Sequence, residues 1–127
     1  MFSHIMLGSN DIARSKRFYD AILGATGCEP AEPNAKGRLV YVHRSGRLVI
    51  TKPLNGEPAT GGNGSTIGFA MNSPEEADAW HKAGVANGGE AIEDAPGVRH
   101  TATGDLYLAY LRDPDGNKLC ALHAMPA

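Results

Sequence analysis

Three places in this chain carry side chains whose chemistry could serve a functional site. His4 lies in an apolar run near the start, where its imidazole can act as a general base, bind a metal or simply hydrogen-bond in a cavity. Cys120 lies in a later apolar run, where its thiol can bind a metal or react, or pack as a small buried group. Arg99 and His100 adjoin each other in a stretch near glycine and proline, which predicts a loop that is either functional or merely solvated. No Ser-His-Asp order, phosphate-cradling glycine loop or paired-carboxylate motif accompanies them.

The residues around His4 predict a strand. Over residues 2–7, His4 and Met6 alternate with aliphatic side chains, which is the period expected of a strand with two different faces. Residues 65–71 predict a second strand of this kind, with Thr66 near its start. Both strands are expected to face the same site.

Cys120 belongs to the second of two predicted β-hairpins. Residues 106–123 form two apolar runs around Asp113-Pro-Asp-Gly116, in which the proline and the glycine suit a tight turn. Residues 38–52 repeat this pattern more weakly around Ser45-Gly46. One hairpin is therefore expected in each half of the chain.

Two amphipathic helices are predicted between the strands. The first covers residues 12–23 and is capped by Asn10 or Asp11. The second covers residues 74–87 and begins after Ser73, which suits the N-cap position. Each helix carries its apolar side chains on one stripe, so that each is expected to cover one face of a sheet.

Less regular segments follow the helices. A short strand is expected near Cys28, and another over residues 90–93. An irregular loop is expected from Ala95 to Gly104, where it carries Arg99 and His100 toward the mouth of the site.

The order of the predicted elements repeats itself. Laying Ser3 onward over Ser65 onward aligns strand, helix, strand and hairpin in each half. One βαβββ unit leaves half of its sheet uncovered, so we expect an α+β fold in which modules 1–58 and 62–127 form one curved mixed sheet with the helices outside. A connector rich in glycine and proline joins the modules into a single domain, and the concave inner face is a natural cavity for a small molecule.

The sequence resembles the vicinal oxygen chelate superfamily, which includes glyoxalase I, the bleomycin- and fosfomycin-resistance proteins and the extradiol dioxygenases. The likeness spans nearly the whole chain and rests on His4, Asn10-Asp-Ile-Ala-Arg-Ser-Lys-Arg-Phe-Tyr19, Gly62-Asn-Gly64 and Asp113-Pro-Asp-Gly-Asn-Lys118. It implies a single glyoxalase-like domain. It does not by itself imply one reaction, because one fold hosts many chemistries.

The resemblance also implies a divalent metal held by ligands from four strands. The four positions fall on His4, Ile50 (or Thr51 if the register slips by one residue), Thr66 and Cys120. His4 and Cys120 could bind zinc, whereas the other positions offer no ligand of normal strength. We therefore expect either no cofactor or a weakly bound divalent metal, for which zinc is the best match.

Two functions are compatible with these residues. The first is a glyoxalase-like lyase or isomerase that acts on a small oxygenated organic molecule, with His4 as the catalytic base. Its substrate would contact Thr66, His100, Arg99, Cys120 and Ile50. The second is a non-catalytic protein of the bleomycin-resistance kind, which binds or sequesters a small molecule and needs a cavity but neither a base nor a metal.

The composition excludes several other classes of protein. With 42% hydrophobic and 20% charged residues, the 127-residue chain is typical of a globular domain. A net charge of −2 without a basic cluster argues against a nucleic-acid partner, and no apolar run approaches the roughly 20 residues that a bilayer requires. The two cysteines lie far apart, and no signal peptide is recognised, so we expect a cytoplasmic protein. The resemblance further implies a homodimer.

Overall fold

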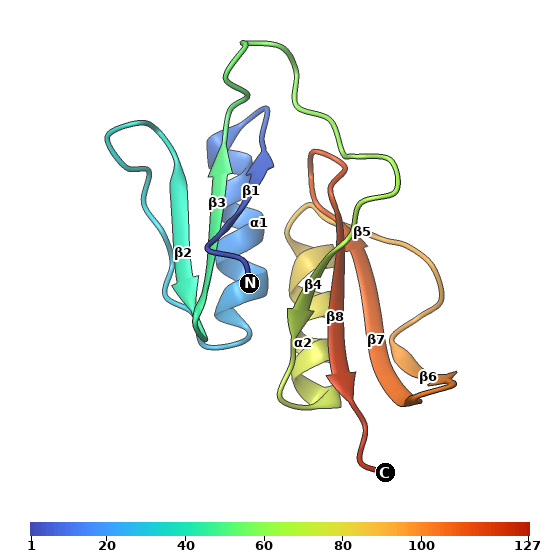
Figure 1. The fold of residues 1–127 in the computed structure, drawn as a ribbon. Helices are drawn as coiled ribbons and strands as arrows, with labels where there is room; N and C mark the ends of the chain where they lie inside the picture. Colours follow the sequence, from blue (N-terminus) through green and yellow to red (C-terminus); the bar gives the residue numbers. More distant parts are fainter.

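Each half of the chain folds into a sheet that carries one helix on a single face, in the computed structural model of residues 1–127 (Figure 1). The first half contains β1 (Ile5–Gly8), α1 (Ile12–Gly24), β2 (Leu39–His43) and β3 (Gly46–Thr51). The second half contains β4 (Ile67–Ala70), α2 (Pro74–Ala86), β5 (Glu90–Ala91), β6 (Gly97–Thr101), β7 (Gly104–Arg112) and β8 (Lys118–Ala124). The predicted α+β fold is therefore confirmed.

The strands form two mixed sheets rather than the single curved sheet that the sequence predicts. In the first sheet the order is β1-β3-β2, and β1 runs parallel to β3. In the second sheet the order is β4-β8-β7-β5, with β6 also paired to β7, and β4 runs parallel to β8. No hydrogen-bonded ladder joins the sheets, but β1 and β4 are the strands through which they face each other (Figure 1).

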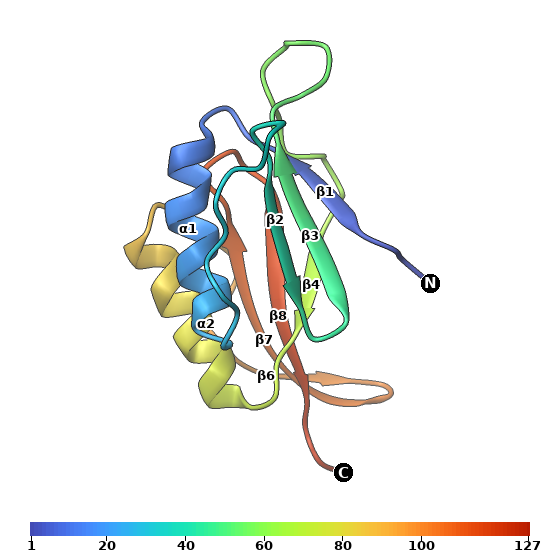
Figure 2. The same cartoon turned by 90° about the vertical axis from the view of Figure 1, so that its left-hand side faces the viewer.

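Both helices lie on the same side of the two sheets (Figure 2). Asp11 caps α1 by accepting a hydrogen bond from the amide of Arg14 at 3.0 Å, and Ser73 caps α2 in the same way, as predicted. At Gly84 of α2 an added Cβ would lie 2.3 Å from Leu111 Cδ1 in the sheet and 3.2 Å from Ile22 Cγ2 of α1, so that glycine permits the close packing of α2 against both. Neither helix is long and apolar enough to cross a membrane.

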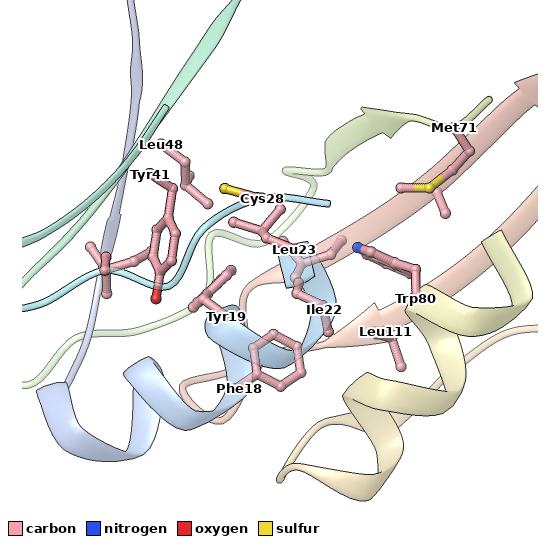
Figure 3. Close-up of a cluster of buried hydrophobic side chains, with 14 of the residues drawn as sticks. Phe18, Tyr19, Ile22, Leu23, Cys28, Tyr41, Leu48, Met71, Trp80 and Leu111 are labelled. Carbon is pink, nitrogen blue, oxygen red and sulfur yellow. The ribbon is translucent and has the colours of Figure 1, made fainter. Parts of the chain in front are cut away.

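The hydrophobic core lies between the helices and the sheets (Figure 3). Phe18 of α1 and Trp80 of α2 occupy equivalent places in the repeat, and both are completely buried. Ile22 and Leu111 fill the space between them. The buried side chains of the two halves thus join into one core.

The segment after α1 departs from the prediction, because no strand forms near Cys28. Its backbone is instead held by side chains of α1. The amide of Ala31 donates to Asp20 Oδ1 at 3.1 Å, and Lys16 Nζ donates to the carbonyl of Ala31 at 2.7 Å. Because these bonds satisfy the backbone without a neighbouring strand, the first half is a βαββ unit.

The second half contains a strand that the sequence does not predict. The expected irregular loop from Ala95 to Gly104 contains strand β6, which pairs antiparallel with β7. Arg99 and His100 therefore lie on a strand, opposite Leu106 and Asp105. The short strand expected at residues 90–93 is observed as β5.

Residues 113–117, here called the acidic turn, dock the second half onto the first. Buried Asp113 accepts a hydrogen bond from the hydroxyl of Tyr19 in α1 at 2.5 Å. Burial and the Asp113 carboxylate raise the pKa of Tyr19, so that its hydroxyl remains a donor. Asp115 forms an ion pair with Arg14 of α1 at 2.7 Å. The motif that indicated a turn therefore also fixes the relation of the two halves.

A second contact occupies the equivalent place between the other turn and the other helix. Arg44, in the turn between β2 and β3, donates to both carboxylate oxygens of Glu76 in α2, at 2.6 and 2.8 Å. Glu76 also accepts a hydrogen bond from the amide of Asn72 at 3.0 Å. The hydrogen bonds from Arg44 hold the pKa of Glu76 below its usual value.

The connector between the halves, residues 52–66, contains no helix or strand. Its course is nevertheless fixed at two points. The side-chain amide of Asn10 donates to the carbonyl of Ala59 at 3.1 Å, and the amide of Ala59 donates to Asn10 Oδ1 at 2.7 Å. Gly61 lies against the acidic turn so closely that an added Cβ would be 2.1 Å from the carbonyl oxygen of Gly116.

Candidate functional site

A cavity of about 340 Å³ lies where the two halves meet. Ile5 of β1 lines one side, and Ile67 and Phe69 of β4 line the other. The remaining apolar lining consists of Phe2, Leu23, Tyr41, Leu48, Ala70 and Met71. This volume lies within the range of roughly 300–1,000 Å³ that is usual for small-molecule sites. The cavity therefore suits a small ligand with an apolar body.

His4 lies on this cavity at the start of β1. Its Nδ1 atom lies 2.8 Å from the hydroxyl oxygen of Ser3, and its Nε2 atom makes no hydrogen bond within the chain. When Nδ1 donates its proton to Ser3, Nε2 carries the lone pair and can accept a proton from a ligand. The arrangement is that of an accessible general base.

Three further basic side chains lie on the same cavity, but two of them are already engaged. Arg44 is held by Glu76, and His43 Nε2 lies 3.0 Å from the carbonyl oxygen of Thr26. The side chain of Arg47 makes no hydrogen bond or ion pair within the chain. Arg47 is therefore the guanidinium available to an anionic or carbonyl oxygen of a ligand.

Ile50 does not face the cavity, contrary to the prediction. It is only 1% exposed and packs in the core on the side of the helices. Strand pairing gives a register that differs from the predicted one: Met6 pairs with Val49, and in the other half Gly68 pairs with Cys120. Val49 is thus the equivalent of Cys120. The sequence alignment of the hairpins is wrong by one residue, and a shift of one residue turns a strand side chain to the opposite face.

Cys120 faces away from the helices, as predicted, but it does not line the cavity of His4. It is 6% exposed, and its Sγ lies 3.5 Å from the carbonyl oxygen of Ala121. Burial raises the pKa of the Cys120 thiol, which keeps the thiol protonated and weakens it as a nucleophile or ligand. Thr66 lies just before β4 and lines a different, polar pocket.

Arg99 and His100 also lie away from His4. The guanidinium of Arg99 donates to the carbonyl oxygens of Gly97, Asp94 and Ala95 at 3.1 Å, which ties it to its own segment. His100 Nδ1 lies 2.8 Å from Asp105 Oδ1 in an exposed hydrogen bond on the hairpin. Neither residue lines the cavity.

The positions that the resemblance implies for a metal do not supply a fitting donor set. They are occupied by His4, Val49, Thr66 and the protonated thiol of Cys120, of which only His4 is a strong ligand. No three side chains of His, Cys, Asp or Glu lie close enough together to hold a metal ion. A catalytic zinc typically needs three protein ligands, so the residues present do not fit a catalytic metal.

Sequence reasoning missed most of the cavity lining. The sequence predicts Phe69 and Met71 in a strand and Tyr41 and Arg47 in a hairpin, but nothing in these segments indicates a shared site. They meet because the two halves pack against each other. The alternation of residues along the strand of Arg47 could have placed this side chain on the same face as His4, had the hairpin register been correct.

Comparison with known proteins gives consistent matches. Residues 1–121 match the family model of the Glyoxalase/Bleomycin resistance protein/Dioxygenase superfamily. A solved glyoxalase/bleomycin resistance protein from Albidiferax ferrireducens T118 is 59% identical, with a TM-score of 0.92, and the match covers 97% of this chain and 98% of that chain. No curated protein matches the sequence.

More distant structures share the fold. A glyoxalase/bleomycin resistance protein/dioxygenase family enzyme from Burkholderia phytofirmans PsJN is 19% identical with a TM-score of 0.70, over 97% of this chain and 98% of that chain. A glyoxalase-related enzyme from Fulvimarina pelagi is 21% identical with a TM-score of 0.70, over 96% of this chain and 86% of that chain. These two similarities concern the fold alone.

Proposed function

The chain belongs to the glyoxalase/bleomycin resistance protein/dioxygenase superfamily, and from that premise we propose that its cavity between the halves binds a small oxygenated organic molecule. The observation that carries this proposal is the combination of an apolar cavity with His4 and an unpaired Arg47 on its lining. An apolar ligand body would bury against Phe69 and Met71, and its oxygen would accept hydrogen bonds from Arg47.

We propose an isomerase-type reaction with His4 as the general base. His4 and Arg47 come one residue before the paired residues Ile5 and Leu48, so they occupy neighbouring places on adjacent strands. Nε2 of His4 takes a proton from a carbon next to a carbonyl, and the electron pair of the broken C–H bond moves to the carbonyl oxygen. Arg47 stabilises the resulting oxyanion. His4 then delivers a proton to the former carbonyl carbon, and the hydroxyl group on the first carbon passes its proton to the oxyanion as it becomes the new carbonyl. The step consumes no external reagent.

A second candidate is a protein that binds or sequesters the same kind of molecule without turnover. The observation that favours it is the donor set, in which Val49, Thr66 and protonated Cys120 accompany a single imidazole. Binding needs only the cavity and Arg47. The two candidates therefore share a ligand class and differ in the role of His4.

The experiment that separates them is proton exchange in deuterium oxide. Purified protein is mixed with adducts of 2-oxoaldehydes and thiols, with and without zinc, nickel and manganese, and NMR follows loss of the proton beside the carbonyl. Under the first candidate, exchange and product form, and His4→Gln slows both by about a hundredfold or more while binding persists. Tight binding without exchange supports sequestration.

Two further variants locate the ligand. Arg47→Ala is expected to weaken binding about tenfold, because a charge-assisted hydrogen bond is lost. Lys82→Ala, in α2, removes an equal charge outside the cavity lining and should change nothing. If Arg47→Ala and Lys82→Ala bind alike, the ligand does not lie in this cavity.

The expected homodimer stays a proposal. It is supported by exposed apolar side chains on the sheet faces that carry no helix, namely Met6, Val42 and Leu122. A second copy that covers these faces would remove them from water. Light scattering at micromolar concentration checks this, and a mass of one chain would exclude it.

A further inference from the structure

A second pocket, of about 350 Å³, lies beside the start of β4 and shares no residue with the cavity of His4. It is lined by Gly61, Gly62, Asn63, Gly64, Ser65, Thr66, Arg112 and Lys118, and by no hydrophobic side chain. We propose that this pocket, here called the glycine-loop pocket, binds the phosphate group of a small polar molecule.

The loop of this pocket is held in a conformation that depends on glycine. Gly64 has a φ of +93°, which residues with a side chain rarely adopt, and an added Cβ on Gly62 would lie 2.7 Å from Ser65 Oγ. Gly61 is fixed against the carbonyl oxygen of Gly116 in the acidic turn. The loop is therefore preformed, and its ordering would cost little on binding.

The loop also carries unused hydrogen-bond donors. Among the amides of residues 61–66, only that of Ser65 has an acceptor in the chain, the carbonyl oxygen of Gly62 at 3.2 Å. The hydroxyl of Thr66 lies on the same pocket and adds a further donor. Successive free amides in a glycine-containing turn are a known type of anion site, since they present several N–H groups to one oxyanion.

Two cationic side chains complete the pocket. Arg112 and Lys118 pair across β7 and β8, so they lie on the same face of the sheet. The guanidinium of Arg112 donates one hydrogen bond to the carbonyl oxygen of Gly116 at 2.9 Å, which orients it and leaves its other donors free. Lys118 Nζ lies 5.1 Å from the centre of the Tyr110 ring and forms an ion pair with Glu93.

The charge and polarity of the lining indicate which class of ligand the pocket would bind. Two cations with several amide and hydroxyl donors match a tetrahedral oxyanion better than a neutral group. The volume exceeds that of a phosphate ion alone, and the absence of apolar lining disfavours a hydrophobic attachment. A phosphate ester of a hydroxylated molecule fits both features. The sequence singles out Gly62-Asn-Gly64 and Thr66 but does not indicate a phosphate site, because the two cations lie far along the chain from the glycine loop.

Titration calorimetry tests the proposal with inorganic phosphate, glycerol phosphate and glucose 6-phosphate as probes, and with glucose as the uncharged control. We expect both esters to bind more tightly than inorganic phosphate, and glucose not to bind. Tighter binding of inorganic phosphate than of either ester would overturn the assignment to a phosphate ester. No binding of any phosphate at millimolar concentration would overturn the proposal as a whole.

Two charge variants give opposite expected effects. Lys118→Gln is expected to weaken glucose 6-phosphate binding about tenfold, because it removes a charge-assisted hydrogen bond. Glu93→Gln is expected to tighten it several-fold, because it frees Lys118 from its ion pair. A merely structural role of the pair would shift both variants in the same direction, and that result would contradict the proposal.

A third variant assigns the binding to the correct pocket. Arg47→Ala, in the cavity of His4, should leave the affinity for glucose 6-phosphate unchanged, and an equal loss in this variant would overturn the assignment. Thermal unfolding of each variant shows that the fold is intact. Because the readout is phosphate binding, its outcome is independent of the proton exchange proposed for His4.

Discussion

The two halves of this molecule dock through contacts that occupy equivalent places and carry opposite charges. In the repeat, Arg14 of α1 corresponds to Glu76 of α2. Arg14 pairs with an acidic residue, Asp115, of the turn in the other half, whereas Glu76 pairs with a basic residue, Arg44. Both halves therefore use the same docking geometry. The charges of the helix residue and the turn residue are reversed together from one half to the other, so that each contact remains a pair of opposite charges.

The two contacts differ more in burial than in geometry. The Asp115 side chain is 1% exposed although its partner Arg14 is 46% exposed, and Asp113 beside it is buried and bonded to Tyr19. The Arg44 and Glu76 side chains are 32% and 16% exposed. Only the first contact is embedded in a buried polar network. We therefore expect the first to control stability and the second to contribute little.

The largest loss of stability is expected when a charge is placed on the helix-covered face of β3. Ile50→Glu places a carboxylate in the core beneath the helices and is expected to cost at least about 4 kcal/mol of unfolding free energy. Val49→Glu, one residue earlier, places its side chain on the face without a helix, where Val49 is 7% exposed, and is expected to cost less, about 2–3 kcal/mol. Urea unfolding measures both.

A control separates charge from size in that comparison. Val49→Gln has nearly the shape of Val49→Glu without the charge, and the two should unfold at similar urea concentrations. Equal destabilisation by Ile50→Glu and Val49→Glu would contradict the expected difference between the two faces of β3.

The next effect compares the two docking contacts directly. Asp113→Ala leaves the Tyr19 hydroxyl and the backbone amides of Asp115 and Asn117 without their acceptor, and about 3–5 kcal/mol of unfolding free energy should be lost. Glu76→Ala removes a partly exposed ion pair and should cost about 1 kcal/mol or less. Thermal and urea unfolding of the two variants side by side decide the matter, and a larger loss for Glu76→Ala would reverse our ranking.

The smallest effect asks whether the charges can be exchanged. Arg44→Asp and Glu76→Arg each place like charges together and should destabilise, whereas the double variant restores a pair with the polarity of Arg14 and Asp115. We expect a coupling of about 0.5–1 kcal/mol in a double-mutant cycle at low salt, decreasing at high salt. A coupling near zero would mean that the paired charges contribute nothing to docking.

The contribution of the pair between Arg44 and Glu76 to stability also depends on pH. Because Arg44 lowers the pKa of Glu76, the wild-type pair stabilises the fold above the unfolded pKa of about 4.3, and this contribution is lost as the pH falls through the lower folded value. In urea unfolding at a series of pH values, the Glu76→Ala variant should therefore lose less stability than the wild type on acidification.

The parts of the fold that could be predicted from the sequence are those fixed by local chemistry. Asp11 and Ser73 cap the helices through bonds to residues three positions away, and such bonds leave a readable pattern. Strand β6 leaves none, because its residues gain their strand conformation from pairing with β7. Near Cys28 the local pattern misleads, since Asp20 and Lys16 of the preceding helix hold the backbone of Ala31 instead.

The candidate site was less predictable, because it depends on register and on contact between the halves. His4, which the resemblance singled out, does lie on the cavity. Ile50 was placed on the wrong face, since a hairpin turn that differs in length between the halves shifts the alignment by one residue. Arg112 and Lys118 share a pocket with the glycine loop only through the pairing of β7 with β8 and of β8 with β4.

The anchoring of the connector has a consequence for how copies of this chain can exchange parts. A loose connector would let the first half of one molecule pair with the second half of another, which is the route to domain swapping. Here Asn10 fixes the connector at Ala59, and Gly61 fixes it against Gly116. The anchored connector keeps each half at a high effective concentration for its own partner. The chain itself, more than the chemistry of the interface, therefore determines which halves associate.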